Sequence, residues 1–342
     1  MKKCLLVLMV LLSSLWAESY TDMLGRSVDI KSSSKLVFLG PGALRLGVYL
    51  GLEERLCGIE KTENEASPFS PYRTFLGKER IAKLPIIGTG GPGKMPDLEA
   101  LVVHKPDLII TSFLDKNQLD LIQSKTGIPV LALSYGASYG GSAQQLLSIK
   151  NSLLLLGKVT QKLPRAEALV TFISEQEVKL STLPVAQKRV YVGGLGYKGA
   201  QGINSTEANY PPFELLGLKN ALFEDKEALG HHFIDMEALI KADPEVIFID
   251  KFGKAKVAQE YAAKKALFDT LSAYKKGNVK DVLGYNFYST NVENLLLISY
   301  QIASILGVHA KLEDEARSIF KAFYGEKGVA LLNQLPYGIH LK

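Results

Sequence analysis

Basic and aromatic residues gather at the points where the predicted strands end. Ligands of open α/β sheets bind beyond the carboxyl ends of the strands, so the residues that follow each strand are candidate ligand contacts. Arginine forks suit carboxylate or catecholate oxygens, and tyrosine rings add contact area with a polar tip. The pattern therefore favours a small ligand that presents such oxygens. The candidates are Arg45, Lys61, Tyr72, Arg73, Lys94, Tyr135, Tyr197, Lys198, Tyr210, Lys251 and Tyr285. Tyr210 could equally pack against the Pro-rich loop in which it lies.

Two adjacent histidines, His231 and His232, follow Gly230 in a predicted loop. Imidazole suits nickel, cobalt, haem iron or a vacant position on a ferric chelate. Tyr288, in a loop ahead of the last long helix, could add a phenolate oxygen. We predict that His232 and Tyr288 approach a metal centre, with His231 and Tyr285 as the substitutes. The alternative is a solvated histidine pair without a ligand role.

Two glycine-rich stretches resemble nucleotide loops but do not support a nucleotide site. Residues 88–95 match G-x-G-x-x-G and most of a P-loop, yet Met95 stands where a Mg²⁺-binding Ser or Thr is required. Residues 194–199 follow a predicted strand without opening a helix. Both loops instead let the backbone approach a ligand closely. The sequence also lacks an H-E-x-x-H motif, a nucleophile elbow and paired catalytic carboxylates. We therefore predict a binding protein with no catalysis and no intrinsic cofactor.

The elements that position these residues alternate between short apolar strands and helices. This alternation is typical of α/β folds with mainly parallel sheets. The same alternation of strands and helices appears on both sides of a polar, glycine-rich passage, so we predict two similar α/β halves. The predicted strands cover residues 36–39, 56–59, 108–111, 130–133, 189–192, 246–250 and 278–282.

An internal repeat supports the two halves. Residues 97–109 and 235–247, which lie 138 residues apart, are identical at six of thirteen positions. In each copy an Asp can cap a short helix that carries Glu99 or Glu237, and a Pro stops the helix before a strand. A repeat at so long an interval indicates paired domains and not a solenoid.

One long helix is predicted to join the halves. Residues 143–156 and 165–183 have helical spacing, with a break at Pro164 and a stop at Pro184. The joining segment lacks the Gly or Ser content of a flexible linker. We predict an N-terminal lobe over 18–160, a connecting helix over 161–185 and a C-terminal lobe over 186–342.

Residues 1–17 have the features of a secretory signal peptide. Lys2 and Lys3 precede an apolar run too short to span a bilayer, and Ala17 is a small residue at the cut. Cleavage would leave Cys57 alone, so a large apolar core and not a disulfide must stabilise the protein. Cleavage also lowers the net charge from +5 to +3, and no Lys/Arg block stands out. Nucleic-acid binding is therefore not expected.

Several segments together resemble those of a known family. They are residues 21–28, residues 40–43 after the first strand, the repeated Asp-x-Glu-Ala-Leu segments, and residues 285–291 before the last long helix. Over nearly the whole mature chain, the sequence resembles the periplasmic solute-binding proteins of iron-siderophore, haem and cobalamin importers. The resemblance implies two similar α/β lobes joined by one long rigid helix, with a ligand cleft between the lobes. It also implies a periplasmic monomer.

The same resemblance implies a function. The ligand would be a metal chelate, a ferric siderophore or a related iron complex, delivered to the membrane permease of an ABC importer. A nickel chelate, haem, cobalamin and molybdate are alternative ligands. Glu99 and Glu237 match positions at which this family docks onto basic residues of the permease, although each Glu could simply favour its helix N-terminus. A chelatase-like metal-handling enzyme is the alternative class, and the absence of short repeats disfavours an adhesive surface protein.

Overall fold

The described chain divides into two units, each built around its own parallel sheet. The first unit takes in the chain up to residue 66 with 76–136 and 149–167, and the second takes in 67–75, 137–148 and the chain from 168 onward. Tyr135 and residues 1–16 of the predicted signal peptide lie outside the described residues. The computed structural model describes residues 17–64, 67, 69–134, 142–224, 227–308 and 311–335.

The sheet of the first unit has the strand order β3-β4-β5. Its strands are fully buried, as continuous apolar runs in a parallel sheet require. They are β3 (Leu36–Leu39), β4 (Leu108–Thr111) and β5 (Val130–Ala132). A separate antiparallel pair joins β1 (Glu18–Thr21) to β2 (Ser27–Ile30). The helical segments are α2 (Ala43–Tyr49), η2 (Glu53–Arg55), η3 (Lys61–Asn64), α4 (Lys78–Lys83), α5 (Leu98–His104) and α6 (Lys116–Thr126).

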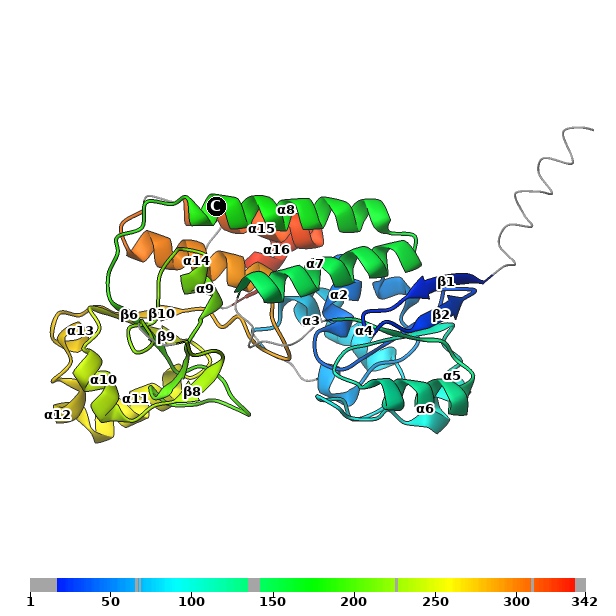
Figure 1. The fold of residues 1–342 in the computed structure, drawn as a ribbon, viewed down its shortest axis with the longest axis horizontal. Helices are drawn as coiled ribbons and strands as arrows, with labels where there is room; N and C mark the ends of the chain where they lie inside the picture. Colours follow the sequence, from blue (N-terminus) through cyan, green and yellow to red (C-terminus); the bar gives the residue numbers. More distant parts are fainter. Residues whose placement is uncertain are drawn as a thin grey trace, which may run out of the picture. The chain divides into compact units, whose positions relative to one another are not determined.

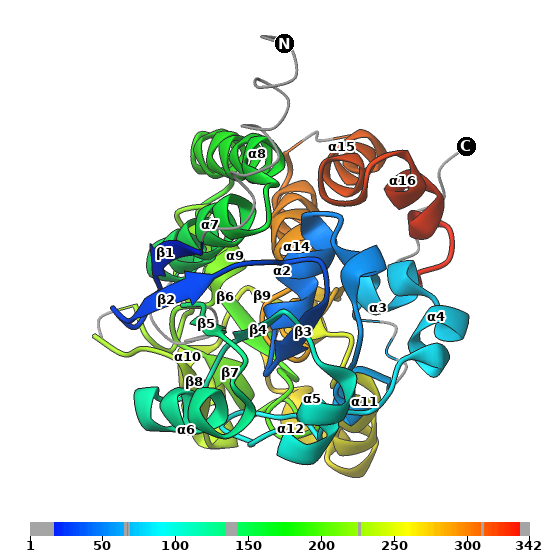
Figure 2. The same ribbon diagram turned by 90° about the vertical axis from the view of Figure 1, so that its right-hand side faces the viewer.

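Helices cover this first sheet on both faces (Figure 2). Leu101 of α5 and Leu119 of α6 pack with Val37 of β3 in one apolar cluster. Phe38, the next residue of β3, points to the opposite face, because side chains alternate along a strand. There Gly47 lets α2 come close, since a Cβ atom at this position would lie 2.5 Å from the Phe38 ring.

The sheet of the second unit has the strand order β10-β9-β6, and all of its pairs are parallel. Its strands are β6 (Val190–Gly193), β9 (Val246–Asp250) and β10 (Val279–Val282). An antiparallel pair joins β7 (Ser205–Glu207) to β8 (His231–Phe233). The helices are α3 (Pro71–Leu76, all but its last residue), α9 (Pro211–Glu214), α10 (Met236–Ala242), α11 (Lys254–Ala263), α12 (Lys265–Phe268), α13 (Ser272–Lys275), α14 (Val292–Ile305), α15 (Leu312–Tyr324) and α16 (Glu326–Leu332).

Alternation along β9 shows how this second sheet is covered. Ile247 and Ile249 belong to the apolar cluster that includes Leu239 of α10. Phe248 points the other way, and its ring centre lies 5.7 Å from that of Phe213 on α9. The sheet therefore lies between α10 and α11 on one face and α9 and α14 on the other (Figure 1).

The internal repeat forms the same unit twice. Asp97 caps α5 by accepting hydrogen bonds from two backbone N–H groups, and Asp235 caps α10 by accepting one. Both helices end at a residue with positive φ, Lys105 at 46° and Asp243 at 39°. The strands that follow, β4 and β9, are each the central strand of their sheet. The predicted mixed α/β class with mainly parallel sheets is confirmed.

Two long helices follow β5 along the chain. They are α7 (Ser142–Val159) and α8 (Leu163–Ser181), and the residues of each are divided between the two units. Pro164 is tolerated because it lies in the first turn of α8, where its missing N–H has no helical partner. The lobe boundaries predicted from the sequence stay a prediction.

The predicted strand over 56–59 is wrong. Leu56 bridges to Leu36, whereas Ile59 bridges to Ile86, and each contact is an isolated bridge. Because the two ends pair with different partners, no ladder of successive hydrogen bonds forms.

Candidate functional site

The carboxyl ends of β6, β9 and β10 meet at one edge of the second sheet, because these strands are parallel. Residues 195–198, 251–252 and 283–288 follow the three strands at this edge. They supply five of the predicted binding residues, so we name this region the carboxyl-edge site. A small pocket there is lined by Leu195, Gly196, Tyr197, Glu207, His231, Asp250, Tyr285 and Asn286.

An arginine held among aromatic rings forms one part of the site. Arg73 of α3 is 4% exposed, and its Nε donates to the hydroxyl of Tyr72 over 3.0 Å. The guanidinium carbon lies 5.7, 5.3 and 5.2 Å from the ring centres of Tyr72, Phe287 and Tyr288. Contacts within about 6 Å of a ring contribute roughly 0.5–2 kcal/mol each. Three predicted residues, Tyr72, Arg73 and Tyr288, are therefore brought together.

The loop that carries Tyr288 is strained. Tyr288 and Ser289 have φ values of 52° and 72°, a region in which a residue with a side chain costs about 1–2 kcal/mol. Asn286 and Thr290 form an antiparallel bridge across the loop, and Gln145 donates to the Thr290 hydroxyl over 2.8 Å. These contacts hold the backbone in the conformation that places the Tyr288 ring over Arg73.

His231 has a defined tautomer at the pocket. The Ser205 hydroxyl donates to the carbonyl of Leu195 over 2.6 Å, so it cannot also donate to Nε2 of His231, which lies 2.7 Å away. Nε2 must therefore carry the proton, and Nδ1 carries the lone pair. Burial lowers the pKa of His231, and His232 lowers it further, so the neutral ring is favoured. It stacks on Tyr197 with ring centres 4.3 Å apart.

The predicted histidine loop is wrong, because His231 and His232 lie on strand β8. Alternation along the strand sends the two rings to opposite sides, as expected for adjacent residues. His231 meets Tyr197, whereas the His232 ring centre lies 5.0 Å from that of Phe223. Nε2 of His232 donates to the carbonyl of Leu229 over 3.1 Å.

Two buried carboxyl groups of the site were missed by the sequence analysis. Glu207 ends β7 and Asp250 ends β9, and they are 4% and 3% exposed. Burial raises the pKa of Glu207 to about 8, although the Tyr285 hydroxyl, which donates to it over 2.5 Å, lowers it. Burial likewise raises the pKa of Asp250 to about 7. Nothing in the neighbouring sequence marked either residue.

The other residues predicted in the second unit differ in exposure. Lys198 is exposed, with its ammonium 5.5 Å from the centre of the Tyr197 ring. Lys251 is half-buried, and burial lowers its pKa. Tyr210 and Tyr285 are each 1% exposed, and their ring centres are 5.6 Å apart. Tyr210 also packs edge-on against Phe213.

The residues predicted in the first unit are scattered. Arg45 lies within α2 and not in a loop after a strand, and its side chain is fully buried. Lys61 begins η3 and Lys94 lies in a loop, and both are exposed. The structure therefore does not gather these three residues into a site, and Tyr135 lies outside the described residues.

Metal-ligating residues do not cluster in the described ranges. No group of three or more His, Cys, Asp or Glu side chains that could hold a metal ion is found there. Direct ligation by His231 or His232 with Tyr288 stays a prediction.

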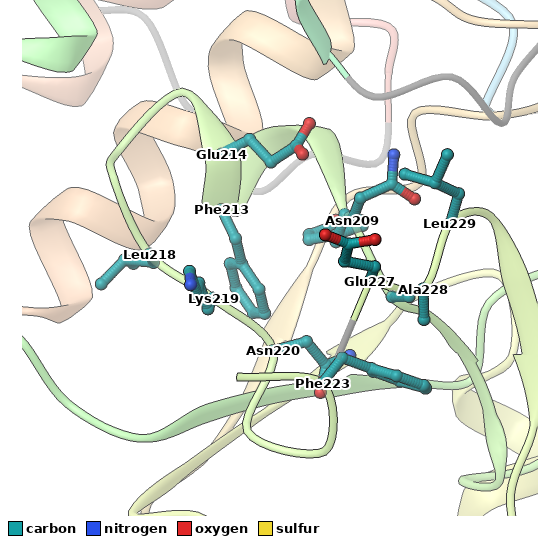
Figure 3. Close-up of a pocket in the computed structure, with 12 residues that line it drawn as sticks. Asn209, Phe213, Glu214, Leu218, Lys219, Asn220, Phe223, Glu227, Ala228 and Leu229 are labelled. Carbon is teal, nitrogen blue, oxygen red and sulfur yellow. The ribbon is translucent and has the colours of Figure 1, made fainter. Parts of the chain in front are cut away.

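A larger pocket of about 490 Å³ lies beside α9, a volume typical of small-molecule sites (Figure 3). The aromatic rings of Phe213 and Phe223 and the carboxylate of Glu227 line it (Figure 3). Tyr210 is the only predicted site residue among those lining it in the described chain. We therefore treat it as separate from the carboxyl-edge site.

The chain belongs to the periplasmic binding protein family, whose model matches residues 71–283. It is 26% identical over 221 residues to the ferric-anguibactin-binding protein FatB of Vibrio anguillarum, covering 62% of this chain and 67% of that protein. This family assignment confirms the predicted class of function, a periplasmic binding protein of ABC importers.

Solved structures share the fold. MolA of Haemophilus influenzae bound to molybdate has a TM-score of 0.67 at 17% identity, covering 90% of this chain and 98% of that chain. CeuE of Helicobacter pylori with Ni(II) bound has a TM-score of 0.65 at 16% identity, covering 92% of this chain and 99% of that chain. Identities this low show the fold alone. Within the described ranges, no helix has both the length and the apolar character needed to cross a bilayer.

Proposed function

We propose that this protein captures a ferric siderophore or a related iron complex in the periplasm and delivers it to the membrane permease of an ABC importer. The observation that carries the proposal is Arg73 among three aromatic rings at the carboxyl-edge site. A fixed positive charge beside ring faces suits the anionic, aromatic shell of such a chelate. The ferric-anguibactin-binding relative supports iron as the metal.

Two lysines extend this positive character. Lys198 follows the stacked Tyr197, and Lys251 follows β9 at the same edge. Their ammonium groups can meet further anionic oxygens of the shell. We propose that Arg73, Tyr197, Lys198 and Lys251 contact the ligand from the second unit.

Two carboxylates are proposed to contact the permease. Glu99 on α5 and Glu237 on α10, here called the docking glutamates, are both exposed. Each is the second residue of its helix, after an Asp cap, in the two copies of the repeat. A negative charge at the same place on each copy suits a basic partner surface.

The test is a titration of purified protein with a ferric catecholate, a ferric hydroxamate, a nickel chelate, haemin, cobalamin and molybdate. Ferric chelates should bind most tightly. Arg73→Ala should weaken this binding by about 10- to 150-fold, the scale of a charge-assisted hydrogen bond. Arg189→Ala is the matched control, because Arg189 precedes β6 and its side chain is 48% exposed. Equal affinity of the Arg73 variant and the wild type would contradict the proposal.

A further inference from the structure

The small pocket of the carboxyl-edge site has an acidic side that chelate capture does not use. Glu207 and Asp250 line it together with Tyr285, and none of the three is more than 4% exposed. The pocket has room for one water-sized group, about 20 Å³. A space this small fits a single ion or a terminal group and excludes a whole chelate.

Two polar atoms beside this pocket lack hydrogen-bond partners within the described chain. They are Oε1 of Glu207 and the hydroxyl of Tyr210, which is 1% exposed. The ring centre of Tyr210 lies 5.6 Å from that of Tyr285, which lines the pocket, and the charges of Asp250 and Glu207 both raise the pKa of Tyr210. Burying a polar atom without a partner is costly, and native proteins usually satisfy such an atom with a bound group.

No lysine or arginine of the described chain is among the groups whose charges shift the pKa of Glu207 or Asp250. Glu214 of α9, which is also acidic, raises the pKa of Glu207 further. Lys251 follows Asp250 in the chain, but its charge partners are Asp281 and Lys254. Burial lowers the pKa of His231, on the neighbouring strand, which favours its neutral form. Among the described residues that line this small pocket, no lysine or arginine balances the two acids.

We propose that this pocket binds an ammonium-sized monovalent cation between the carboxylates of Glu207 and Asp250. The Tyr285 hydroxyl donates to Glu207, so its oxygen lone pairs remain able to accept from the cation. A transition metal is disfavoured, because no group of three Asp, Glu, His or Cys side chains in the described ranges is arranged to hold a metal ion. The cation is either a free ion such as K⁺ or NH₄⁺, or the terminal ammonium of a bound ligand. The proposal does not depend on which chelate the protein carries.

Thermal unfolding in matched chloride salts at pH 8.5 tests the proposal, with tetramethylammonium as the reference because it is too large for the pocket. For a dissociation constant of about 1 mM, 100 mM of NH₄⁺ or K⁺ should raise Tm by roughly 5 °C. Butylammonium reports a ligand-borne amine, because its tail must extend out of the pocket. Glu207→Gln keeps the side-chain shape and should abolish the shift. The exposed Glu175→Gln on α8 should retain it.

The outcomes distinguish a free cation from the ammonium group of a bound ligand. A shift with NH₄⁺ or K⁺ that Glu207→Gln abolishes supports a free cation, and a shift with butylammonium alone supports the amine of a ligand. Equal Tm values in all salts, or a shift that persists in Glu207→Gln, overturn the proposal in favour of a buried water. If Glu207→Gln does not fold, Asp250→Asn replaces it. Calorimetric titration of the wild type with NH₄Cl against tetramethylammonium chloride requires no variant.

Discussion

Replacing Glu207 with Gln should change how the stability of the protein depends on pH. The folded state raises the pKa of this carboxyl group from 4.5 to about 8, chiefly through burial. A raised acid pKa gives stability that is fully present below pH 4.5 and is lost as pH rises through 8. Between pH 6 and pH 9, Glu207 should therefore lower the free energy of unfolding by about 3 kcal/mol. Asp250, with a pKa of about 7, should lower it by about 1 kcal/mol more.

The variant removes the ionisation but keeps an oxygen that can accept from Tyr285. Its stability relative to the wild type should therefore rise by about 3 kcal/mol between pH 6 and pH 9. Urea unfolding, followed by far-UV circular dichroism in tetramethylammonium buffers, measures both proteins without a small cation. Asp250→Asn is the internal comparison, with an expected change of about 1 kcal/mol over the same range.

A stability difference that stays constant within about 0.5 kcal/mol from pH 6 to pH 9 would refute this reasoning. It would mean that Glu207 is already ionised at pH 6 in the folded protein, so that desolvation does not control this carboxyl group.

Three further predictions address transport, packing and metal contact. Replacing both docking glutamates with alanine should preserve chelate affinity and abolish uptake by cells. The control pair Glu167→Ala and Glu175→Ala should preserve affinity and uptake. A loss of affinity in the docking variant would contradict a docking role. Gly253→Ala should lower the free energy of unfolding by about 3 kcal/mol or more in denaturant titration, because the added Cβ would lie 2.1 and 2.5 Å from two backbone carbonyl oxygens. A loss below about 1 kcal/mol would show that the backbone can move to make room for the methyl group. His231→Ala and Tyr288→Phe should each alter the visible spectrum of a bound ferric chelate, because His231 is the histidine at the carboxyl-edge site. Unchanged spectra in both variants would restrict recognition to the organic shell.

The sequence predicts the fold well where the signal is local. Apolar, β-branched runs locate β4 and β9 because a buried parallel strand needs such side chains on both faces. The Asp caps and Pro stops likewise locate α5 and α10. The run over 56–59 has the same composition, but a strand also needs a continuous partner, and its two ends bridge to different segments. Partner choice is a property of the tertiary fold.

The residues of the candidate site were likewise predicted only in part. Arg73 and Tyr288 were predicted because they follow strands or their loops, and the fold brings them together. The histidines were placed in a loop because β8 exists only through pairing with β7, 26 residues earlier, where Thr206 lies opposite His232. Glu207 was missed for a related reason. Burial gives this carboxyl group its unusual pKa, and burial arises from residues distant in the chain.

The central claim, capture of an iron chelate, is tested most directly by analysing protein purified from the periplasm of its own cells without added ligand. Inductively coupled plasma mass spectrometry would identify the metal, and mass spectrometry of the extracted ligand would identify the chelator. The account predicts stoichiometric iron with an organic chelator that presents catecholate, hydroxamate or carboxylate oxygens. Stoichiometric molybdenum, nickel or cobalt, or a haem group in place of the chelator, would contradict it.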